Sequence, residues 1–208
     1  MINLNNTLLL FDPGHGTREY TAGKRAPDNT LYEGEWAREI VDLLVKACKE
    51  ELGIGCVNLV PEPDDIPRMT RVERAKEYIK EGYKCYYISI HINAASGDLK
   101  WHSASGFSVY VSKNASQSSI TLAKNVYEAA ESFGLQGNRS VPREKVWRAN
   151  YDVLYYTPCP AILTENLYMD NMVDLEFLKS DRGKEVVVNY HLIGICKTLG
   201  LPYSSLII

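Results

Sequence analysis

Apolar runs alternate with amphipathic stretches along most of the chain. Buried strands are indicated where aliphatic and β-branched residues form short runs that end at Gly, Pro or small polar residues. These strands are expected at residues 8–11, 54–60, 85–95, 106–112, 153–156 and 161–165. Apolar residues at helical spacing, in several cases followed by Gly, predict helices. These helices are expected at residues 31–52, 68–80, 118–133, 171–179 and 183–199.

Strands that alternate with helices are typical of an α/β sheet covered by helices on both faces. The chain has 208 residues and no internal repeat, low-complexity tract or linker, so a single domain over residues 1–208 is expected. The alternating pattern at 106–112 is interpreted as an edge strand, and residues 138–150 as a basic loop.

Composition narrows the function classes. A net charge of −3 argues against nucleic acid as the main partner, because neutralising phosphates requires a basic surface. The five cysteines are scattered without a C-x-x-C pair, which favours reduced thiols in the core over a disulfide framework. No apolar run is long enough to span a membrane, and the first residues lack the basic start of a signal peptide.

Four side chains with useful chemistry occur where elements meet. His15 lies in the motif Asp-Pro-Gly-His-Gly that follows the first strand, and His91 and Glu165 lie at the ends of two other predicted strands. Glu33 begins the first predicted helix. Because ligands of open α/β sheets gather at the carboxyl ends of strands, we expect these four side chains to meet at one edge of the sheet.

Two imidazoles and a carboxylate are suitable ligands for zinc, which leaves one position open in catalytic sites. His15, Glu33 and His91 are therefore predicted to bind the metal, and Glu165 to act as the general acid and base. Each residue also has a simpler explanation. A histidine at a strand end often only holds the backbone, a Glu at a helix start often only caps the helix, and Glu165 could pair with an arginine.

The other candidates are weaker. His191 lies on an apolar face of the last predicted helix and is interpreted as a packing residue, whereas His102, in the loop after His91, could contact substrate. Cys159 stands between two prolines with no helix start to lower its pKa, which disfavours a cysteine hydrolase. The basic segment Arg139–Arg148 could bind carboxylates or could be an ordinary solvated loop.

Four motifs occur in the order found in a known family. They are Phe-Asp-Pro-Gly-His-Gly at residues 11–16, the Glu that opens the first helix, Ser-Ile-His-Ile-Asn-Ala at 89–94, and Pro-Ala-Ile-Leu-Thr-Glu-Asn at 160–166. With them the chain resembles the zinc-dependent N-acetylmuramoyl-L-alanine amidases, which include bacterial cell-wall amidases and phage endolysins. The resemblance extends over residues 8–199.

The resemblance implies a largely parallel sheet of about six strands and cleavage of the amide between N-acetylmuramic acid and L-alanine of the peptidoglycan stem peptide. It also implies zinc on His15, Glu33 and His91, with Glu165 as the catalytic acid and base. Glu33 fits the ligand position better than Glu35 because an apolar helical run follows it at the family spacing. Where the family usually has Glu-x-Gly-Phe, this chain has Glu-Asn-Leu-Tyr at residues 165–168.

Two alternatives remain open: a zinc carboxypeptidase or endopeptidase that acts on stem peptides, and a peptidoglycan-binding module without catalysis. In either case peptidoglycan is the expected partner, the bacterial cell wall is the expected place of action, and a monomer is expected. A signal peptide is not evident, so export would follow trimming or release as a phage-type lysin. No long helix is predicted between His91 and Gly106, which favours an open groove that needs no activator protein.

Overall fold

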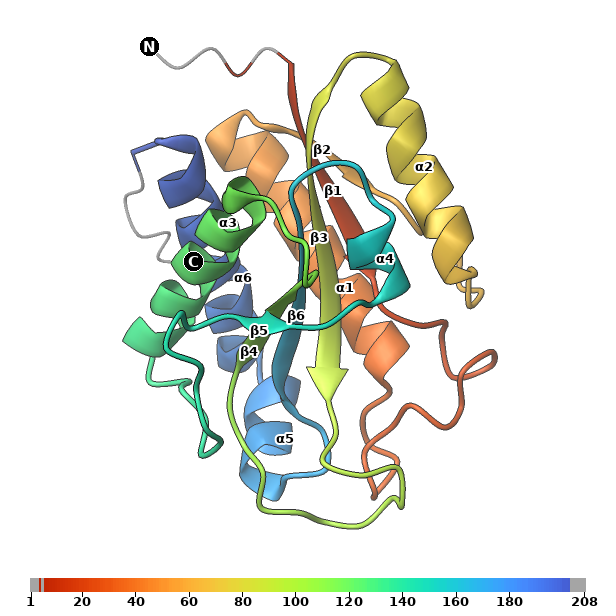
Figure 1. Ribbon diagram of the computed structural model, residues 1–208. Coiled ribbons are helices and arrows are strands. Elements are labelled where there is room, and N and C mark those ends of the chain that lie inside the picture. Colours follow the sequence, from red (N-terminus) through yellow and green to blue (C-terminus); the bar gives the residue numbers. More distant parts are fainter. Residues whose placement is uncertain (1–3, 5, 203–208) are drawn as a thin grey trace.

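A six-stranded sheet forms the centre of the protein, of which a computed structural model describes residue 4 and residues 6–202 (Figure 1). The strands are β1 (Thr7–Pro13), β2 (Gly55–Asn58), β3 (Lys84–Asn93), β4 (Ser108–Val111), β5 (Trp147–Arg148) and β6 (Ala161–Tyr168). They are arranged in the order β2-β1-β3-β6-β4-β5. All neighbours pair in parallel except β4 and β6, which confirms the predicted α/β class with a largely parallel sheet.

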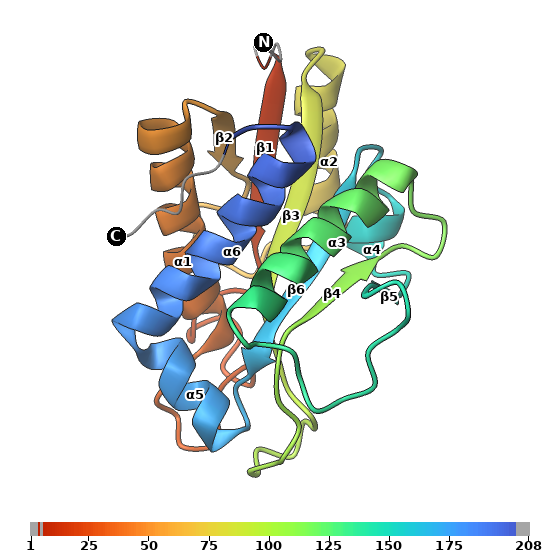
Figure 2. The same cartoon turned by 90° about the vertical axis from the view of Figure 1, so that its left-hand side faces the viewer.

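Helices cover both faces of this sheet (Figure 2). They are α1 (Glu33–Ala47), α2 (Arg68–Lys80), α3 (Gln117–Ser132), α4 (Asp152–Tyr155), α5 (Met172–Lys179) and α6 (Asp181–Leu199). Alternate residues of β1 face opposite sides: Leu9 and Phe11 pack in the core with α1, α3 and α6, whereas Leu8 and Leu10 pack with α2 and α4. The sheet is therefore buried on both faces, as its continuous apolar strands require.

The helix expected at residues 31–52 is confirmed in two parts. A single π-helical turn, η1 (Cys48–Leu52), follows α1 directly. The helix ends at Gly53, which has a φ of 61°. A glycine accepts this left-handed conformation without the steric cost of a Cβ. At its other end, α1 begins at Glu33.

Three of the sequence-based expectations are wrong. Residues 153–155 of the predicted strand 153–156 belong to the helical turn α4. Val153 and Leu154 pack in the same core on one face of the sheet, whereas adjacent residues of a strand point to opposite faces. The predicted loop at 138–150 contains the edge strand β5, whose two pairs with β4 are too short a pattern to detect in the sequence. The strand expected at the edge, β4, therefore lies between β6 and β5.

The chain changes its direction across the sheet at the neighbouring strands β1 and β3. The connection from β1 leads through α1 to β2 on one side, whereas β3 has β6 and β4 on its other side. In open α/β sheets, ligands bind at such a point beyond the carboxyl ends of the strands. A ligand is therefore expected beside the segment that follows β1 and the segment that ends β3.

None of the helices in residues 6–202 is both long and apolar enough to cross a membrane. All five cysteines are free: four of them are buried, and Cys159 is half-buried. Burial raises the pKa of the Cys159 thiol to about 12, which removes it as a nucleophile near neutral pH.

His191 of α6 is fully buried and supplies a prediction about acid stability. Its Nδ1 lies 2.8 Å from the carbonyl oxygen of Val187 and its Nε2 lies 3.1 Å from Oγ1 of Thr164. Burial lowers the pKa of His191 from 6.5 to about 4. Below pH 6.5 the unfolded chain therefore takes up a proton that the folded protein excludes, and the free energy of unfolding falls as the pH drops toward 4.

The expected loss between pH 7.5 and 4.5 is on the order of 2–3 kcal/mol from this residue. Denaturant unfolding at both pH values measures it. The variant His191→Gln should be less stable at pH 7.5 but should lose less stability on acidification. An equal loss in wild type and variant would contradict the assignment. His102→Gln, which alters a partly exposed histidine, serves as the control.

Candidate metal centre

His15 lies in the tight turn that follows β1. Its backbone φ is 57°, a left-handed conformation that is uncommon for a residue with a side chain. The preceding Gly14 donates its N–H to the carbonyl oxygen of Ile90, and a Cβ at Gly14 would lie 2.4 Å from ring atoms of His91. The turn can therefore bring His15 next to β3 only because residue 14 is a glycine.

Glu33 enters the site from the first turn of α1. A Cβ on the next residue, Gly34, would lie 1.8 Å from the carbonyl oxygen of Gly16, so the start of α1 packs directly against the His15 turn. The Glu33 side chain is 2% exposed, and its Oε1 accepts a hydrogen bond from the backbone N–H of Ile92 at 3.1 Å. A carboxylate is thus held at one place between α1, the His15 turn and β3.

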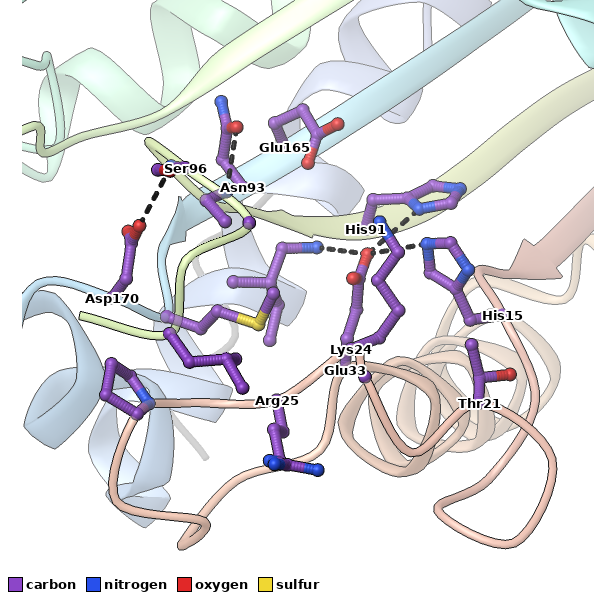
Figure 3. A pocket seen from close by; sticks show the side chains of 17 residues that line it. His15, Thr21, Lys24, Arg25, Glu33, His91, Asn93, Ser96, Glu165 and Asp170 are labelled. Atoms are coloured by element: carbon purple, nitrogen blue, oxygen red, sulfur yellow. Dashed lines mark hydrogen bonds and ion pairs between the residues drawn. The ribbon is translucent and has the colours of Figure 1, made fainter. Parts of the chain in front are cut away.

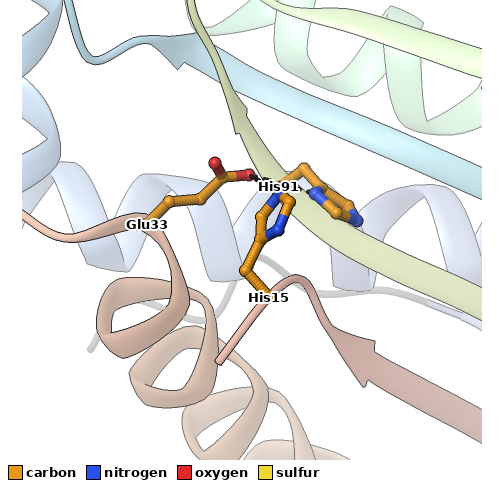
Figure 4. A group of neighbouring side chains, drawn as sticks. All are labelled: His15, Glu33 and His91. Atoms are coloured by element: carbon orange, nitrogen blue, oxygen red, sulfur yellow. Dashed lines mark hydrogen bonds and ion pairs between the residues drawn. The ribbon is translucent and has the colours of Figure 1, made fainter. Parts of the chain in front are cut away.

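His91 of β3 completes a cluster of three potential metal ligands (Figure 4). Oε1 of Glu33 lies 3.0 Å from Nδ1 of His91 and 3.4 Å from Nε2 of His15. The two imidazole rings stand nearly perpendicular, with their centroids 5.1 Å apart. One potential ligand atom from each residue lies within 4.8 Å of the other two, so the three can share one ion.

The spacing of these atoms fits zinc. Ligand atoms about 2.0–2.1 Å from a tetrahedral zinc ion lie about 3.3–3.4 Å apart, close to the 3.0 Å and 3.4 Å found here. Two nitrogen donors and one oxygen donor are a common set for catalytic zinc. The donor set and its geometry therefore suit a zinc ion with a fourth position for water or substrate.

The charges within the cluster are strongly coupled. Burial lowers the pKa of His15 to about 4, although the Glu33 carboxylate acts in the opposite direction. Burial also disfavours the charged form of His91, but its hydrogen bond to Glu33 and the nearby carboxylates raise its pKa above the ordinary value. Neutral imidazole is the form that binds a metal, and His15 is held in that form.

Glu165 lies beside the three ligands on β6, where it is the register partner of His91 (Figure 3). Its Oε2 is buried and has no hydrogen-bond partner among the described residues. Burial, assisted by the negative charge of Glu33, raises the pKa of Glu165 to about 7. β6 continues to Tyr168, so Glu165 lies within this strand and not at its end as the sequence suggested.

Two cavities adjoin the cluster, with volumes of about 520 and 600 Å³. The residues that line both of them are His15, Lys24, His91 and Glu165. Arg25 and Asn93 belong to the first cavity, which Figure 3 shows, and Arg68 and Tyr151 belong to the second. The ligand cluster is therefore accessible from two directions.

The structure distinguishes between the two candidate acidic ligands. Glu35 is bound by Arg18, with its carboxylate oxygens 2.6 and 2.7 Å from the guanidinium, whereas Glu33 contacts both histidines. His102 pairs with Asp98 at 2.9 Å and is not among the residues that line the first cavity. His191 is fully buried in the core.

The basic segment 139–148 does not line either cavity at the cluster. Its Arg139 donates to the hydroxyl of Tyr168, and Lys145 and Arg148 pair with glutamates. The cations at the cavities include Lys24, Arg25 and Arg68, which sequence reasoning missed. Lys24 and Arg25 belong to an irregular segment without periodicity, and no local pattern indicates where such a segment packs.

Asp12 and Ser89 are two further residues at the site that sequence reasoning did not identify. Asp12 is 1% exposed and Ser89 is fully buried, and Ser89 contacts the ring of His91. The only sequence signal was their place within the Asp-Pro-Gly-His-Gly and Ser-Ile-His motifs, where Asp12 precedes His15 by three residues and Ser89 precedes His91 by two.

Comparisons with known proteins agree with this geometry. A family model described as N-acetylmuramoyl-L-alanine amidase matches residues 9–197. An endolysin of Bacillus phage SPP1 is 27% identical over 201 residues, which cover 95% of this chain and 68% of the relative. The amidase CwlM of Bacillus licheniformis is 26% identical, with 95% of this chain and 70% of the relative covered.

Solved structures show the same fold. The crystal structure of an N-acetylmuramoyl-L-alanine amidase from Clostridium difficile 630 superposes with a TM-score of 0.79 at 19% identity, and the match covers 94% of this chain and 98% of that one. The amidase AmiC2 of Nostoc punctiforme gives a TM-score of 0.77 at 23% identity, with 94% and 98% covered. On the evidence of the family model, which spans nearly the whole chain, the protein belongs to the N-acetylmuramoyl-L-alanine amidase family.

Proposed function

We propose that this protein is a zinc-dependent hydrolase that cleaves the amide between N-acetylmuramic acid and the L-alanine of the peptidoglycan stem peptide. His15, Glu33 and His91 would hold the zinc ion, and Glu165 would act as general acid and base. The observation that carries the proposal is the cluster of three donor atoms within 4.8 Å, with an unpaired carboxylate on the next strand. We further propose that the α/β domain carries this activity without another domain.

A zinc ion bound there would supply Lewis acidity, which polarises a carbonyl group and makes water more acidic. The protein's own residues fix the remaining geometry. The backbone N–H of Ile92 orients Glu33, and the close contact of Gly14 with the His91 ring keeps the two histidines together. Both devices hold the ligands at positions set by backbone packing.

Glu165 has the properties of a residue that moves a proton near neutral pH. Its pKa of about 7 allows it to accept a proton from the attacking water and to release the same proton to the alanine nitrogen as the C–N bond breaks. The water oxygen remains on the lactyl carbonyl carbon, which becomes a carboxylic acid. The position of Glu165 next to His91 on the adjacent strand supports this role.

Individual basic side chains in the cavities fit a substrate with carboxylates. Lys24 and Arg25 line the first cavity, and Lys24 also lines the second. Stem peptides carry carboxylates, which Lys and Arg side chains bind well. The bacterial cell wall is accordingly the proposed place of action, with peptidoglycan as the substrate.

Zinc removal and restoration provide the first test. Purified protein should contain about one zinc per chain, because one three-ligand cluster binds one ion. Clearing of a peptidoglycan suspension should stop after chelation and return when zinc is added, and magnesium should not restore it because it prefers six oxygen ligands. Protein that clears the wall equally well without metal would refute zinc dependence.

Mass spectrometry of the digested wall identifies the bond. The proposed activity releases intact stem peptides with a free alanine amine. Shortened peptides that remain attached to the glycan would instead indicate a carboxypeptidase or endopeptidase. Protein that sediments with the wall and yields no new product would indicate a binding module.

A further inference from the structure

A chain of buried polar groups leads away from the candidate metal centre. Nε2 of His91, the ring nitrogen that does not face Glu33, lies 3.2 Å from Oγ of Ser89. Oγ of Ser89 in turn lies 2.6 Å from Oδ2 of Asp12. Ser89 is fully buried and Asp12 is 1% exposed, so water does not compete for these contacts.

Both carboxylate oxygens of Asp12 accept hydrogen bonds from buried partners. Its Oδ1 lies 2.6 Å from Nη1 of Arg71, a residue that is itself only 4% exposed. Its Oδ2 accepts from two hydroxyl groups, that of Tyr87 at 2.7 Å and that of Ser89 at 2.6 Å. The hydrogen of each hydroxyl group is therefore directed at Asp12.

The direction of these hydrogen bonds determines which ring nitrogen of His91 carries a proton. A serine hydroxyl has a single hydrogen, and the hydrogen of Ser89 is used by Asp12. Ser89 Oγ can therefore only accept from His91, which places a proton on Nε2. Nδ1, which lies 3.0 Å from Oε1 of Glu33, is then the nitrogen whose lone pair becomes available to a metal once its own proton has left.

We propose that Asp12 and Ser89 form a positioning pair that holds the proton of His91 on Nε2 and thereby directs the lone pair of Nδ1 at the metal. The inference rests on the proposed function, because it takes zinc as the ion held by the cluster. Ser89 and Asp12 would touch neither the ion nor the substrate. They act through the orientation and the tautomer of His91, in the manner of outer partners at other zinc sites.

Arg71 extends this arrangement to the second face of the sheet. It belongs to α2, and besides Asp12 it donates to the carbonyl oxygens of Pro13 and Ile66. The guanidinium thus neutralises Asp12 and also holds the backbone one step before the Gly14–His15 turn. A single buried ion pair therefore connects the orientation of His91 with the turn that carries His15.

Tyr87 offers a matched control for Ser89. Both hydroxyl groups donate to the same oxygen of Asp12, both residues belong to β3, and both are fully buried. The hydroxyl of Ser89 also contacts His91. Ser89→Ala and Tyr87→Phe therefore remove one equivalent hydrogen bond from Asp12, but only Ser89→Ala removes the acceptor for His91.

Zinc affinity, measured by competition with a chromogenic chelator, tests the proposal with full-length protein. Ser89→Ala should weaken zinc binding by about 10–100-fold, the usual effect of losing an outer partner of a ligand histidine. Tyr87→Phe should leave the affinity close to the wild-type value while lowering the unfolding midpoint of the metal-free protein about as much as Ser89→Ala does. Equal zinc affinities in the two variants would overturn the proposal.

Nitrogen NMR of the wild-type protein gives a second test that needs no variant. In zinc-loaded protein labelled with ¹⁵N-histidine, His91 should show a proton on Nε2 and metal on Nδ1. Metal on Nε2 would overturn the pair even if Ser89→Ala failed to fold. Wild-type protein that binds zinc and cleaves peptidoglycan, with Ser89→Ala unchanged, would refute only the positioning pair, whereas wild-type protein without zinc affinity would refute the proposed function as well.

Discussion

Replacing Glu165 with glutamine is expected to lower the turnover of peptidoglycan by about 10²–10⁴-fold, the usual contribution of a general acid and base. Glutamine has nearly the same shape but can neither take up nor release the proton. Zinc content should stay at the wild-type level, because the three donor atoms that could hold the ion belong to His15, Glu33 and His91. Stem-peptide release measured by mass spectrometry, together with metal analysis of the same sample, gives both values.

Glu35→Gln is the matched control for this substitution. It makes the same chemical change at a carboxylate that binds Arg18 and lines neither cavity, so turnover should be nearly unchanged. Wild-type turnover in Glu165→Gln would show that another group moves the proton. Loss of zinc from Glu165→Gln would show that Glu165 is itself a ligand.

The variant His91→Ala is expected to lose both zinc and activity. It removes one of two nitrogen donors, and its effect on zinc affinity should exceed the 10–100-fold that follows loss of an outer partner. It also leaves the Glu33 carboxylate, which is 2% exposed, without one of its two histidine neighbours. Chelator competition and stem-peptide release, measured on the same preparation, test the expectation.

His102→Ala provides the comparison, because it removes the same side chain from a position where the histidine binds Asp98. This variant should retain zinc and most of its activity. If His91→Ala retained stoichiometric zinc at wild-type affinity, the three-ligand cluster would be the wrong site. If His102→Ala lost activity but kept zinc, His102 would contact substrate, as one interpretation of the sequence allowed.

The sequence was sufficient to predict the parts of the molecule that depend on local patterns. The apolar run before Asp-Pro-Gly-His-Gly indicated β1 and the turn that carries His15. The helical spacing from Trp36 to Leu44 indicated α1 and therefore the position of Glu33 at its start. Convergence of these residues followed from a general property of parallel sheets, which place the carboxyl ends of their strands at one edge.

Features that depend on distant pairing could not be predicted in this way. The two-residue strand β5 exists only because it pairs with β4. The helix α4 is a single turn, which is too short to show the helical spacing of apolar residues. The ion pair between Asp12 and Arg71 joins residues 59 positions apart. In one sequence, nothing distinguishes Arg71 from the other arginines of its helix, although it alone among them is fully buried.

The glycine contacts around the His15 turn have a consequence for how the ion would be taken up. Because Gly14 packs on the His91 ring and Gly34 packs on Gly16, backbone packing alone holds the histidines and Glu33 close together. Binding would then use little free energy to order the chain, in contrast to small zinc domains that fold only with their metal. Zinc loading of this protein should consequently resemble the filling of a rigid receptor, without a folding transition.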